Sequence, residues 1–425
     1  MKVLLISHNV ISETNNMGKT MLSYFQAFAP EEIAEFYIQE KEPKNASVCN
    51  SFYRITDRDA LKSVFWKKVG TSFHLTKSWP ESVAPTIGAV ETIRQYGRKR
   101  NAPVYIMRNA VWSLAHWKSK EMLFWLHDFN PDVIFFMSGD YSFMYKITLE
   151  IQEMLQKPLV VCCVDDYYLY NRNEGSALGR LQHRSFMKSV NRLMDKASCI
   201  LTISDSMGDA YHKLFNKPCF TLHTSAKRRS CSDKTERSGI AYFGNLGFRR
   251  FEQVAEIGKA VKRLNVNNIH EIDVYSGEKN PDNLMGLTRE NGVHFHGEIS
   301  SADVAARMDK CLAIIHTESF RPEFMNMTRY SVSTKIADSL LNGPCLIAYG
   351  PEGIASIDYL KKNKAAYVIT RPEDLENGLR EVLTNEELRA EIVENARVLG
   401  SKNHDESVNP QKVRKWLQMA VDGTF

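Results

Sequence analysis

The chain has 425 residues, a formal net charge of +5 and 43% hydrophobic residues. This length exceeds that of a usual single domain, so two domains are expected. The small positive charge does not indicate nucleic-acid binding, and no recognition motif for nucleic acid is present. The composition is that of an ordinary soluble globular protein.

The cysteine pattern and the shortness of the apolar runs predict a cytoplasmic protein. Eight cysteines are scattered without a Cys-x-x-Cys pair, and the adjacent Cys162 and Cys163 stand in an apolar strand. Such residues are typical of a reduced core. The first residues, MKVLLISHNV, are too short and too polar for a signal peptide, and no apolar run has membrane-spanning length.

The strand and helix patterns, taken in chain order, predict two α/β domains. Short apolar runs alternate with longer helical patterns, which is typical of parallel sheets with crossover helices. In the first half, strands are expected at 3–7, 34–39, 133–137, 158–164, 197–204 and 219–223. Between residues 40 and 130 the pattern is irregular, with helical pieces at 59–69 and 112–128, and this insertion is expected to carry substrate-specific structure.

Basic residues gather within this insertion next to aromatic ones: Arg94, Arg98, Lys99, Arg100 and Arg108 stand near Tyr96, Trp112, Trp117 and Trp125. One interpretation is peripheral contact with the anionic inner face of a membrane. The other, which we favour, is a solvated helix face above core aromatics.

A polar stretch at 225–238 predicts a linker, after which the strand–helix rhythm restarts. Strands are expected within 239–245, 270–277, 292–298, 311–317, 345–350 and 365–370. Helices are expected at 249–264, 301–309, 372–382, 385–399 and 408–421. We therefore predict an N-terminal Rossmann-like domain at 1–224, a C-terminal one at 239–404, and a terminal helical segment at 405–425.

The segment SVSTKIADSLLNGPCLIAYG, residues 331–350, predicts a phosphate site at a helix start. Ser333 or Thr334 can cap the helix, whose first amides are unpaired donors. Lys335 adds a positive charge that attracts phosphate. Asp338, on the next turn, can accept hydrogen bonds from a ribose diol. The segment is thus a nucleotide-diphosphate site in outline.

A second glycine-containing turn, FGNLGFRR, follows the first strand of the C-terminal domain. Gly244 and Asn245 precede Arg249 and Arg250 at a helix start, which makes an anion-binding arrangement. The full G-x-G-x-x-G pattern is missing, so a dinucleotide site is not expected. Together with Lys335 the arginines can bracket a diphosphate.

Other strand ends supply further candidates, because ligands bind beyond the carboxyl ends of parallel strands. Backbone groups at Ile299 can pair with a nucleobase edge. His294 and His296 share a strand face, but no carboxylate or cysteine partner is evident, so no metal site is predicted. Glu318, just past a strand, is expected to meet a ligand.

In the N-terminal domain the first strand leads into a GKT triplet. A P-loop needs glycine where Glu13 stands, so the P-loop signature fails. Asn16 and Gly18 either bring amides near phosphate or sugar, or form an ordinary strand–helix connection. Asp165 and Asp166 directly follow another strand, where they can bind an acceptor hydroxyl or act as general base. Helix capping or pairing with arginine are the alternatives.

These motifs together resemble GT-B glycosyltransferases of the large retaining family that includes many bacterial exopolysaccharide and capsule enzymes. The resemblance rests on SHNVISETNNMGKT, ISDSM, FGNLGFRR and STKIADSLLNGPCLIAYG. The last is similar to the family pattern P-S-K-x-x-E-Y-x-x-x-G-x-P, with Ser333 at the proline and Asp338 at the glutamate. Tyr330 stands where the family's first paired glutamate is usual.

The resemblance implies two domains facing across a cleft, with the terminal helix crossing back onto the N-terminal domain. It implies a nucleotide-sugar in the C-terminal domain, with Arg249 or Arg250 and Lys335 on its diphosphate and Asp338 on its ribose. The acceptor would occupy the N-terminal domain. No metal, cofactor or covalent nucleophile is implied.

The predicted function is that of a retaining glycosyltransferase. It would move a sugar from a nucleotide-diphosphate-sugar to a saccharide or lipid-linked saccharide, in polysaccharide or cell-envelope glycan synthesis. Asp165 and Glu318 are the candidate catalytic acids. The alternatives are a UDP-sugar 2-epimerase and a non-catalytic sugar-nucleotide-binding partner of a glycan assembly complex.

Overall fold

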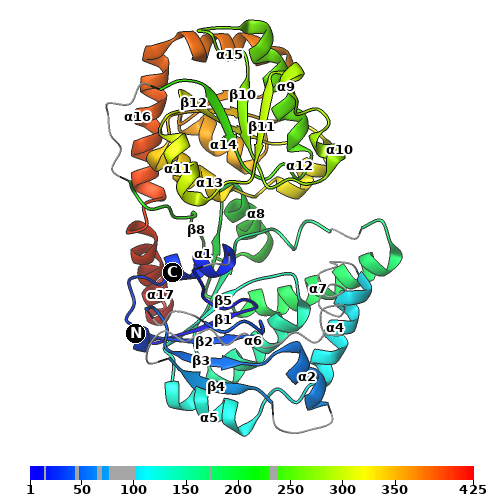
Figure 1. Cartoon of the computed structure of the whole chain (residues 1–425). Coiled ribbons are helices and arrows are strands. Elements are labelled where there is room, and N and C mark those ends of the chain that lie inside the picture. Colours follow the sequence, from blue (N-terminus) through cyan, green and yellow to red (C-terminus); the bar gives the residue numbers. More distant parts are fainter. Residues whose placement is uncertain (14–15, 44–46, 65–68, 76–101, 172–173, 230–236) are drawn as a thin grey trace. The chain divides into compact units, whose positions relative to one another are not determined.

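The structure is a computed structural model that describes residues 1–425 except 14–15, 44–46, 65–68, 76–101, 172–173 and 230–236. The chain divides into two compact units (Figure 1). The first unit comprises Met1–Leu222 and Pro410–Phe425, and the second comprises His223–Asn409. Each unit is built around its own sheet.

The first unit holds an eight-stranded sheet in the order β4-β3-β2-β1-β5-β6-β7-β8. Its pairs are parallel except for β3 with β4. The strands are β1 (Val3–Ser7), β2 (Ile33–Tyr37), β3 (Ser51–Arg54), β4 (Thr71–His74), β5 (Val133–Met137), β6 (Leu159–Cys163), β7 (Cys199–Thr202) and β8 (Cys219–Thr221). Every residue of β1, β2, β5 and β6 is buried, as expected for parallel strands covered on both faces.

Helices cover this first sheet. They are α1 (Asn16–Tyr24), α2 (Asp57–Ser63), α4 (Ala102–Leu114), α5 (Lys120–Phe129), α6 (Ser142–Leu155), α7 (Ala177–Lys196) and α8 (Asp205–Phe215), with a short turn η1 (Pro30–Glu32). The last helix, α17 (Val408–Asp422), also buries Val413 and Leu417 in the core of this unit.

The second unit holds a six-stranded, fully parallel sheet in the order β11-β10-β9-β12-β13-β14. The strands are β9 (Ile240–Phe243), β10 (Ile272–Tyr275), β11 (Val293–Gly297), β12 (Ala313–Thr317), β13 (Cys345–Tyr349) and β14 (Tyr367–Ile369). The helices and helical turns are α9 (Arg250–Leu264), α10 (Pro281–Leu284), η2 (Arg289–Asn291), α11 (Ser301–Met308), α12 (Pro322–Thr328), α13 (Thr334–Asn342), α14 (Ala355–Lys362), η3 (Pro372–Asp374), α15 (Leu375–Thr384) and α16 (Glu386–Asn403).

The predicted fold class, α/β with two Rossmann-like parallel-sheet units, is confirmed. The irregular insertion differs in detail from its prediction. It contains the unpredicted strands β3 and β4, and the expected helix at 112–128 is two helices, α4 and α5. The break is local in origin, because the Ser119 hydroxyl accepts a hydrogen bond from the Met122 amide at 3.1 Å and caps α5.

Of the four aromatic residues considered for membrane contact, the three tryptophans lie in the core, and Tyr96 lies outside the described residues. Trp112, Trp117 and Trp125 are buried, and Arg108 forms an ion pair with Asp57 at 2.9 Å. The basic residues at 94, 98, 99 and 100 lie outside the described residues. Among the described helices, none is long and apolar enough to cross a membrane.

The described ends of the predicted linker at 225–238 belong to the second unit. Ala226 forms a bridge with Asp405, and the Arg229 amide donates to Asn342 Oδ1 at 2.7 Å. Residues 230–236 of this segment lie outside the described part of the chain.

Candidate functional site

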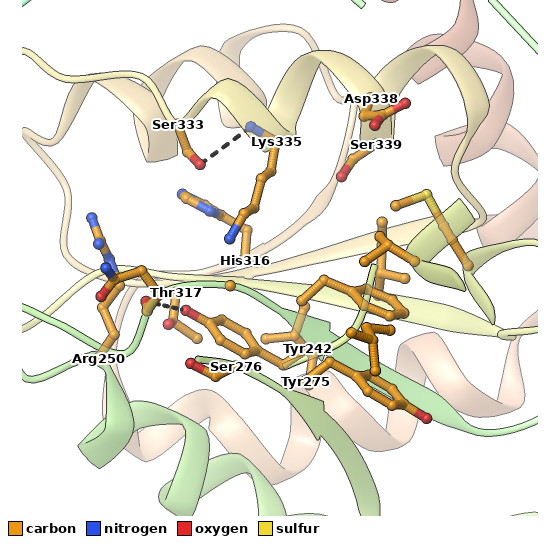
Figure 2. A pocket seen from close by; sticks show the side chains of 18 of the residues that line it. Tyr242, Arg250, Tyr275, Ser276, His316, Thr317, Ser333, Lys335, Asp338 and Ser339 are labelled. Atoms are coloured by element: carbon orange, nitrogen blue, oxygen red, sulfur yellow. Dashed lines mark hydrogen bonds between the residues drawn. The ribbon is translucent and has the colours of Figure 1, made fainter. Parts of the chain in front are cut away.

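A cavity of about 610 Å³ opens at the carboxyl ends of β9, β10, β11 and β12 in the second unit. Side chains from the starts of α9 and α13 also line it. Figure 2 shows Lys335 extending from α13 toward these strand ends, with Tyr242, Ser276 and Thr317 among the residues around the space. This is the edge at which parallel α/β sheets bind ligands.

Lys335 is a cation of this cavity that has no compensating partner among the described residues. It stands on the first turn of α13, where its amide donates to the Ser333 hydroxyl at 3.4 Å. Its ammonium forms no hydrogen bond or ion pair with any described residue. The cavity walls desolvate the ammonium and Arg250 repels it, which together lower the pKa of Lys335 to about 8. A bound anion would offset both effects on the pKa, because a nearby negative charge favours the ammonium form.

Gly244 makes room for this lysine at the end of β9. A Cβ atom at residue 244 would lie 3.0 Å from Lys335 Nζ and 2.9 Å from the Tyr242 hydroxyl. Both distances are too short for an undisturbed side chain. A glycine at this turn therefore lets the ammonium approach the backbone at the end of β9.

Arg250, the second cation of the cavity, is already paired. Its guanidinium donates to Glu318, with Nη2–Oε2 at 2.9 Å, Nη2–Oε1 at 3.0 Å and Nε–Oε2 at 3.2 Å. The Glu318 side chain is only 3% exposed and does not line the cavity. Its carboxylate therefore holds Arg250 in place and offsets its charge.

His316 lies beside this ion pair as a neutral residue. Its Nε2 is 3.0 Å from the Ser356 hydroxyl and 3.6 Å from Glu318 Oε1. Burial, followed by the charges of Arg250 and Lys335, lowers the pKa of His316 to about 3. The cationic character of the cavity thus comes from Lys335 and from the exposed edge of Arg250.

The loop before α9 decides which arginine enters the cavity. Phe248 and Arg249 both have left-handed backbone, with φ of 55° and 61°. This places Arg249 outside the lining, where it pairs with Glu252 at 3.3 Å. Of the two arginines that the sequence offers, Arg250 is the one at the cavity.

The cavity also has an acidic and polar part. Asp338, one turn after Lys335, lines it and accepts a hydrogen bond from Asn342 Nδ2 at 3.0 Å on one oxygen. Glu278 and Glu298 come from the ends of β10 and β11. Hydrogen bonds from the Asn280 amide and Asn283 lower the pKa of Glu278, so its carboxylate is ionised at neutral pH.

The structure brings most predicted donor-site residues together. Those that line the cavity are Gly244, Asn245, Arg250, Ile299, Ser333, Lys335 and Asp338. Thr334 is exposed at the start of α13 and does not line it. The strand-end rule could also have identified Ser276 and Thr317, which follow the same edge of the sheet.

The remaining predicted residues belong to the first unit. Asp166 Oδ1 accepts hydrogen bonds from the Tyr168 amide, the Leu169 amide and the Tyr211 hydroxyl, so it stabilises a turn against α8. Asp165 is exposed and accepts from the Tyr167 hydroxyl at 3.0 Å.

Gly18 packs in α1, where a Cβ would lie 2.8 Å from the Val10 carbonyl oxygen. This close approach explains the glycine without a ligand. Asn16 begins α1, and its side chain lies outside the described part of the chain.

A polar cluster that sequence reasoning missed follows β1 and β5 in the same unit. His8 Nε2 lies 2.9 Å from Arg108 Nη2, and Arg108 stacks over the Tyr141 ring at 4.0 Å. Burial, then the Arg108 charge, lowers the pKa of His8 to about 4. Both His8 and Tyr141 come just after parallel strands, which is the signal that could have identified them.

Comparison with known proteins bears on both halves of the chain. Residues 249–409 match the family model described as Glycosyl transferase-like. Comparison with curated proteins gives no match. Among solved structures, Anabaena HepE in complex with UDP has a TM-score of 0.61 at 13% identity, covering 98% of this chain and 100% of HepE.

Two further solved structures show the same fold. WaaG, a glycosyltransferase involved in lipopolysaccharide biosynthesis, has a TM-score of 0.54 at 12% identity and covers 97% of this chain and 99% of its own. Sucrose-phosphate synthase from Thermosynechococcus elongatus has a TM-score of 0.55 at 9% identity, with 100% of both chains covered. The fold is therefore that of GT-B glycosyltransferases, and the match to the glycosyl transferase-like model lies in the second unit.

Proposed function

We propose that this protein is a retaining glycosyltransferase that takes a sugar from a nucleotide-diphosphate-sugar. The observation that carries the proposal is the ammonium of Lys335, on the first turn of α13, which no described residue compensates in a cavity of about 610 Å³. HepE, which has the same fold, was crystallised with UDP and with UDP-glucose. A uridine diphosphate sugar is therefore the first donor to test.

The donor diphosphate would lie against Lys335, the amides that begin α13 and the exposed edge of Arg250. These groups would stabilise the negative charge that develops on the departing diphosphate, which is the role that a metal ion serves elsewhere, and we assign no covalent protein nucleophile. Asp338 would accept from the ribose hydroxyls, and backbone groups at Ile299 would pair with the nucleobase.

The acceptor would be a saccharide or a lipid-linked saccharide of polysaccharide or envelope glycan synthesis. WaaG, another protein of this fold, is involved in lipopolysaccharide biosynthesis, which supports this class of acceptor. Asp165 and the cluster around His8 are the polar groups of the first unit that we assign to acceptor binding. The seven described cysteines are all free, and six are buried, which supports a reducing cytoplasm.

Lys335→Ala tests the donor site. Loss of a charged partner for phosphate typically costs about 1.5–3 kcal/mol, so UDP should bind roughly 10- to 150-fold more weakly by calorimetry. UDP release from UDP-glucose with a panel of saccharide acceptors should fall as well. Lys259→Ala, on the exposed face of α9, is the matched control and should leave both unchanged.

Equal UDP affinity in the Lys335→Ala and unmutated proteins would contradict the assignment of the donor site. Binding of UDP without turnover of any nucleotide-sugar on a broad acceptor panel would instead favour a non-catalytic binding partner.

A further inference from the structure

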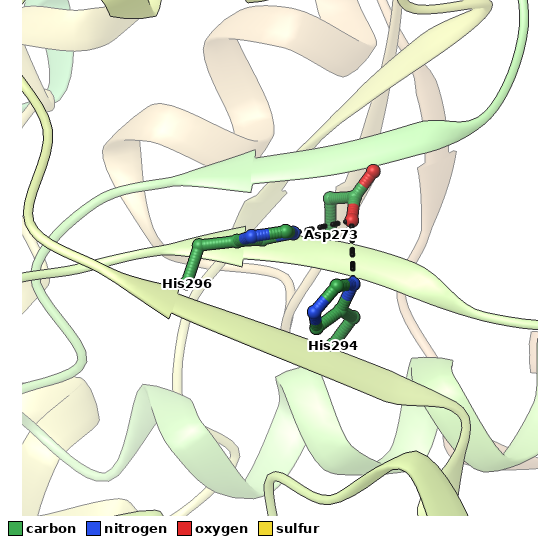
Figure 3. Close-up of side chains that lie close together, drawn as sticks. All are labelled: Asp273, His294 and His296. Carbon is green, nitrogen blue, oxygen red and sulfur yellow. Dashed lines mark hydrogen bonds and ion pairs between the residues drawn. The ribbon is translucent and has the colours of Figure 1, made fainter.

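Three side chains of the metal-ligating kind converge on the outer strands of the second sheet. Asp273 comes from β10, and His294 and His296 come from the edge strand β11 (Figure 3). One ligand atom from each lies within 4.8 Å of the other two. Sequence reasoning found no carboxylate near the histidines; the parallel pairing of β10 with β11 supplies one.

The strand register explains the convergence. Asp273 pairs directly with His294, and the register then shifts, because Tyr275 pairs with Gly297 rather than with His296. This irregularity leaves His296 without an opposite residue, and such bulges redirect side chains. His296 Nε2 lies 2.6 Å from Asp273 Oδ1, and His294 Nδ1 lies 3.5 Å from the same oxygen.

Neighbouring groups hold the two imidazoles. The Tyr275 ring stacks on His296 at 4.6 Å between centroids, and the two histidine rings are 3.9 Å apart. Glu271 Oε1 lies 3.8 Å from His294 Nδ1, the same nitrogen that faces Asp273. All three side chains keep between 24% and 43% of their surface exposed, so an ion can reach them.

We propose that Asp273, His294 and His296 form a binding site for a divalent transition-metal ion of the zinc class. Two imidazoles and one carboxylate are ligands that zinc prefers, and three protein ligands leave a further position for water. The site would join β10 to β11 and stabilise the outer edge of the sheet. It is separate from the proposed sugar transfer, which uses no metal.

Arg289 is the group that competes with the ion. Its Nη2 lies 2.9 Å from Nδ1 and 2.8 Å from Nε2 of His294, while its Nη1 forms 3.0 Å contacts with both oxygens of Glu271. Metal binding therefore requires the guanidinium to withdraw from the imidazole toward Glu271. Removal of Arg289 should raise the affinity for zinc, because it removes a positive charge and frees Glu271.

The test is titration of chelator-treated full-length protein with Zn²⁺ against a chromophoric chelator, together with thermal unfolding. One equivalent of zinc should bind and raise the melting temperature. His296→Gln and Asp273→Asn should each weaken binding at least tenfold, whereas Arg289→Ala should strengthen it. His270→Ala, an exposed histidine just before β10, is the matched control and should bind like the unmutated chain.

Absence of a stoichiometric zinc equivalent, or equal zinc affinity in the His296→Gln and unmutated proteins, would overturn the proposal. Arg289→Ala keeps the test decisive if His296→Gln or Asp273→Asn folds poorly. The proposal requires this variant to bind zinc more tightly than the unmutated protein, and poor folding would not produce that result.

Discussion

Lys335 and Arg250 carry the same formal charge, but their surroundings give them different tasks. Arg250 is held by the buried carboxylate of Glu318, whereas the Lys335 ammonium has no such partner among the described residues. Desolvation and Arg250 lower the pKa of Lys335 to about 8, close to working pH. The positive charge that Lys335 would present to the donor diphosphate therefore depends on pH.

UDP affinity should fall as pH rises above about 8. In the protein without UDP, the Lys335 ammonium loses its proton there, while the diphosphate of UDP stays ionised. If only the ammonium form binds well, the dissociation constant should rise by up to about tenfold per pH unit. Lys335→Arg keeps its charge and should remove this dependence. Calorimetric titrations between pH 7 and 10 measure it, and the same decline in Lys335→Arg would refute Lys335 as the titrating group.

At the scale of a single helix, Gly258 sets how closely α9 packs on the sheet. A Cβ atom there would lie 2.4 Å from Val293 Cγ2 and 2.7 Å from the Asn291 carbonyl oxygen. Neither neighbour can withdraw easily, because Val293 is buried in β11 and the other contact is backbone. The same helix carries Arg250 at its first residue, so its position matters for the cavity.

Gly258→Ala should destabilise the second unit by about 1–3 kcal/mol, the usual cost of overpacking a tight contact. Denaturant unfolding followed by circular dichroism measures the loss. Gly286→Ala is the matched control, because its nearest atom, Ala255 Cβ, is 3.7 Å from the added carbon. If both variants unfolded at the same denaturant concentration, the packing argument would be wrong.

The chain as a whole leaves the first unit after Leu222 and re-enters it at Pro410 through α17. Val413 and Leu417 of this helix are fully buried with the core of that unit, and Arg414 pairs with Glu32 at 2.9 Å. The C-terminal helix α17 therefore contributes to the stability of the first unit, which begins at Met1. The four tryptophans that the structure describes, Trp112, Trp117, Trp125 and Trp416, all belong to this unit, so tryptophan fluorescence reports its unfolding.

Leu417→Ala should lower the stability of the first unit by about 2–5 kcal/mol, the typical cost of truncating a buried leucine. The midpoint of the tryptophan-fluorescence unfolding curve should shift to lower denaturant. Val421→Ala, at a residue that is 38% exposed on the same helix, should have a small effect. Similar shifts for the two variants would argue against packing of α17 in the core.

Much of the fold and part of the site could be predicted because their signals are local. Buried parallel strands are short apolar runs, and their carboxyl ends mark the ligand edge of the sheet. Lys335, Gly244 and Asp338 were therefore found from sequence and do line one cavity. β3 and β4 were missed because four-residue strands with polar residues carry little periodicity.

The sequence by itself determined two α/β units and the residues that follow their strands, since apolar periodicity and turn chemistry act over a few neighbouring residues. Only the tertiary structure decided which of these residues meet. The backbone at Phe248 and Arg249 selected Arg250 for the cavity, and Glu318, 68 residues away, became its partner. The pairing of β10 with β11 set Asp273 beside His294 and His296. Such contacts depend on strand register and burial, which no local pattern encodes.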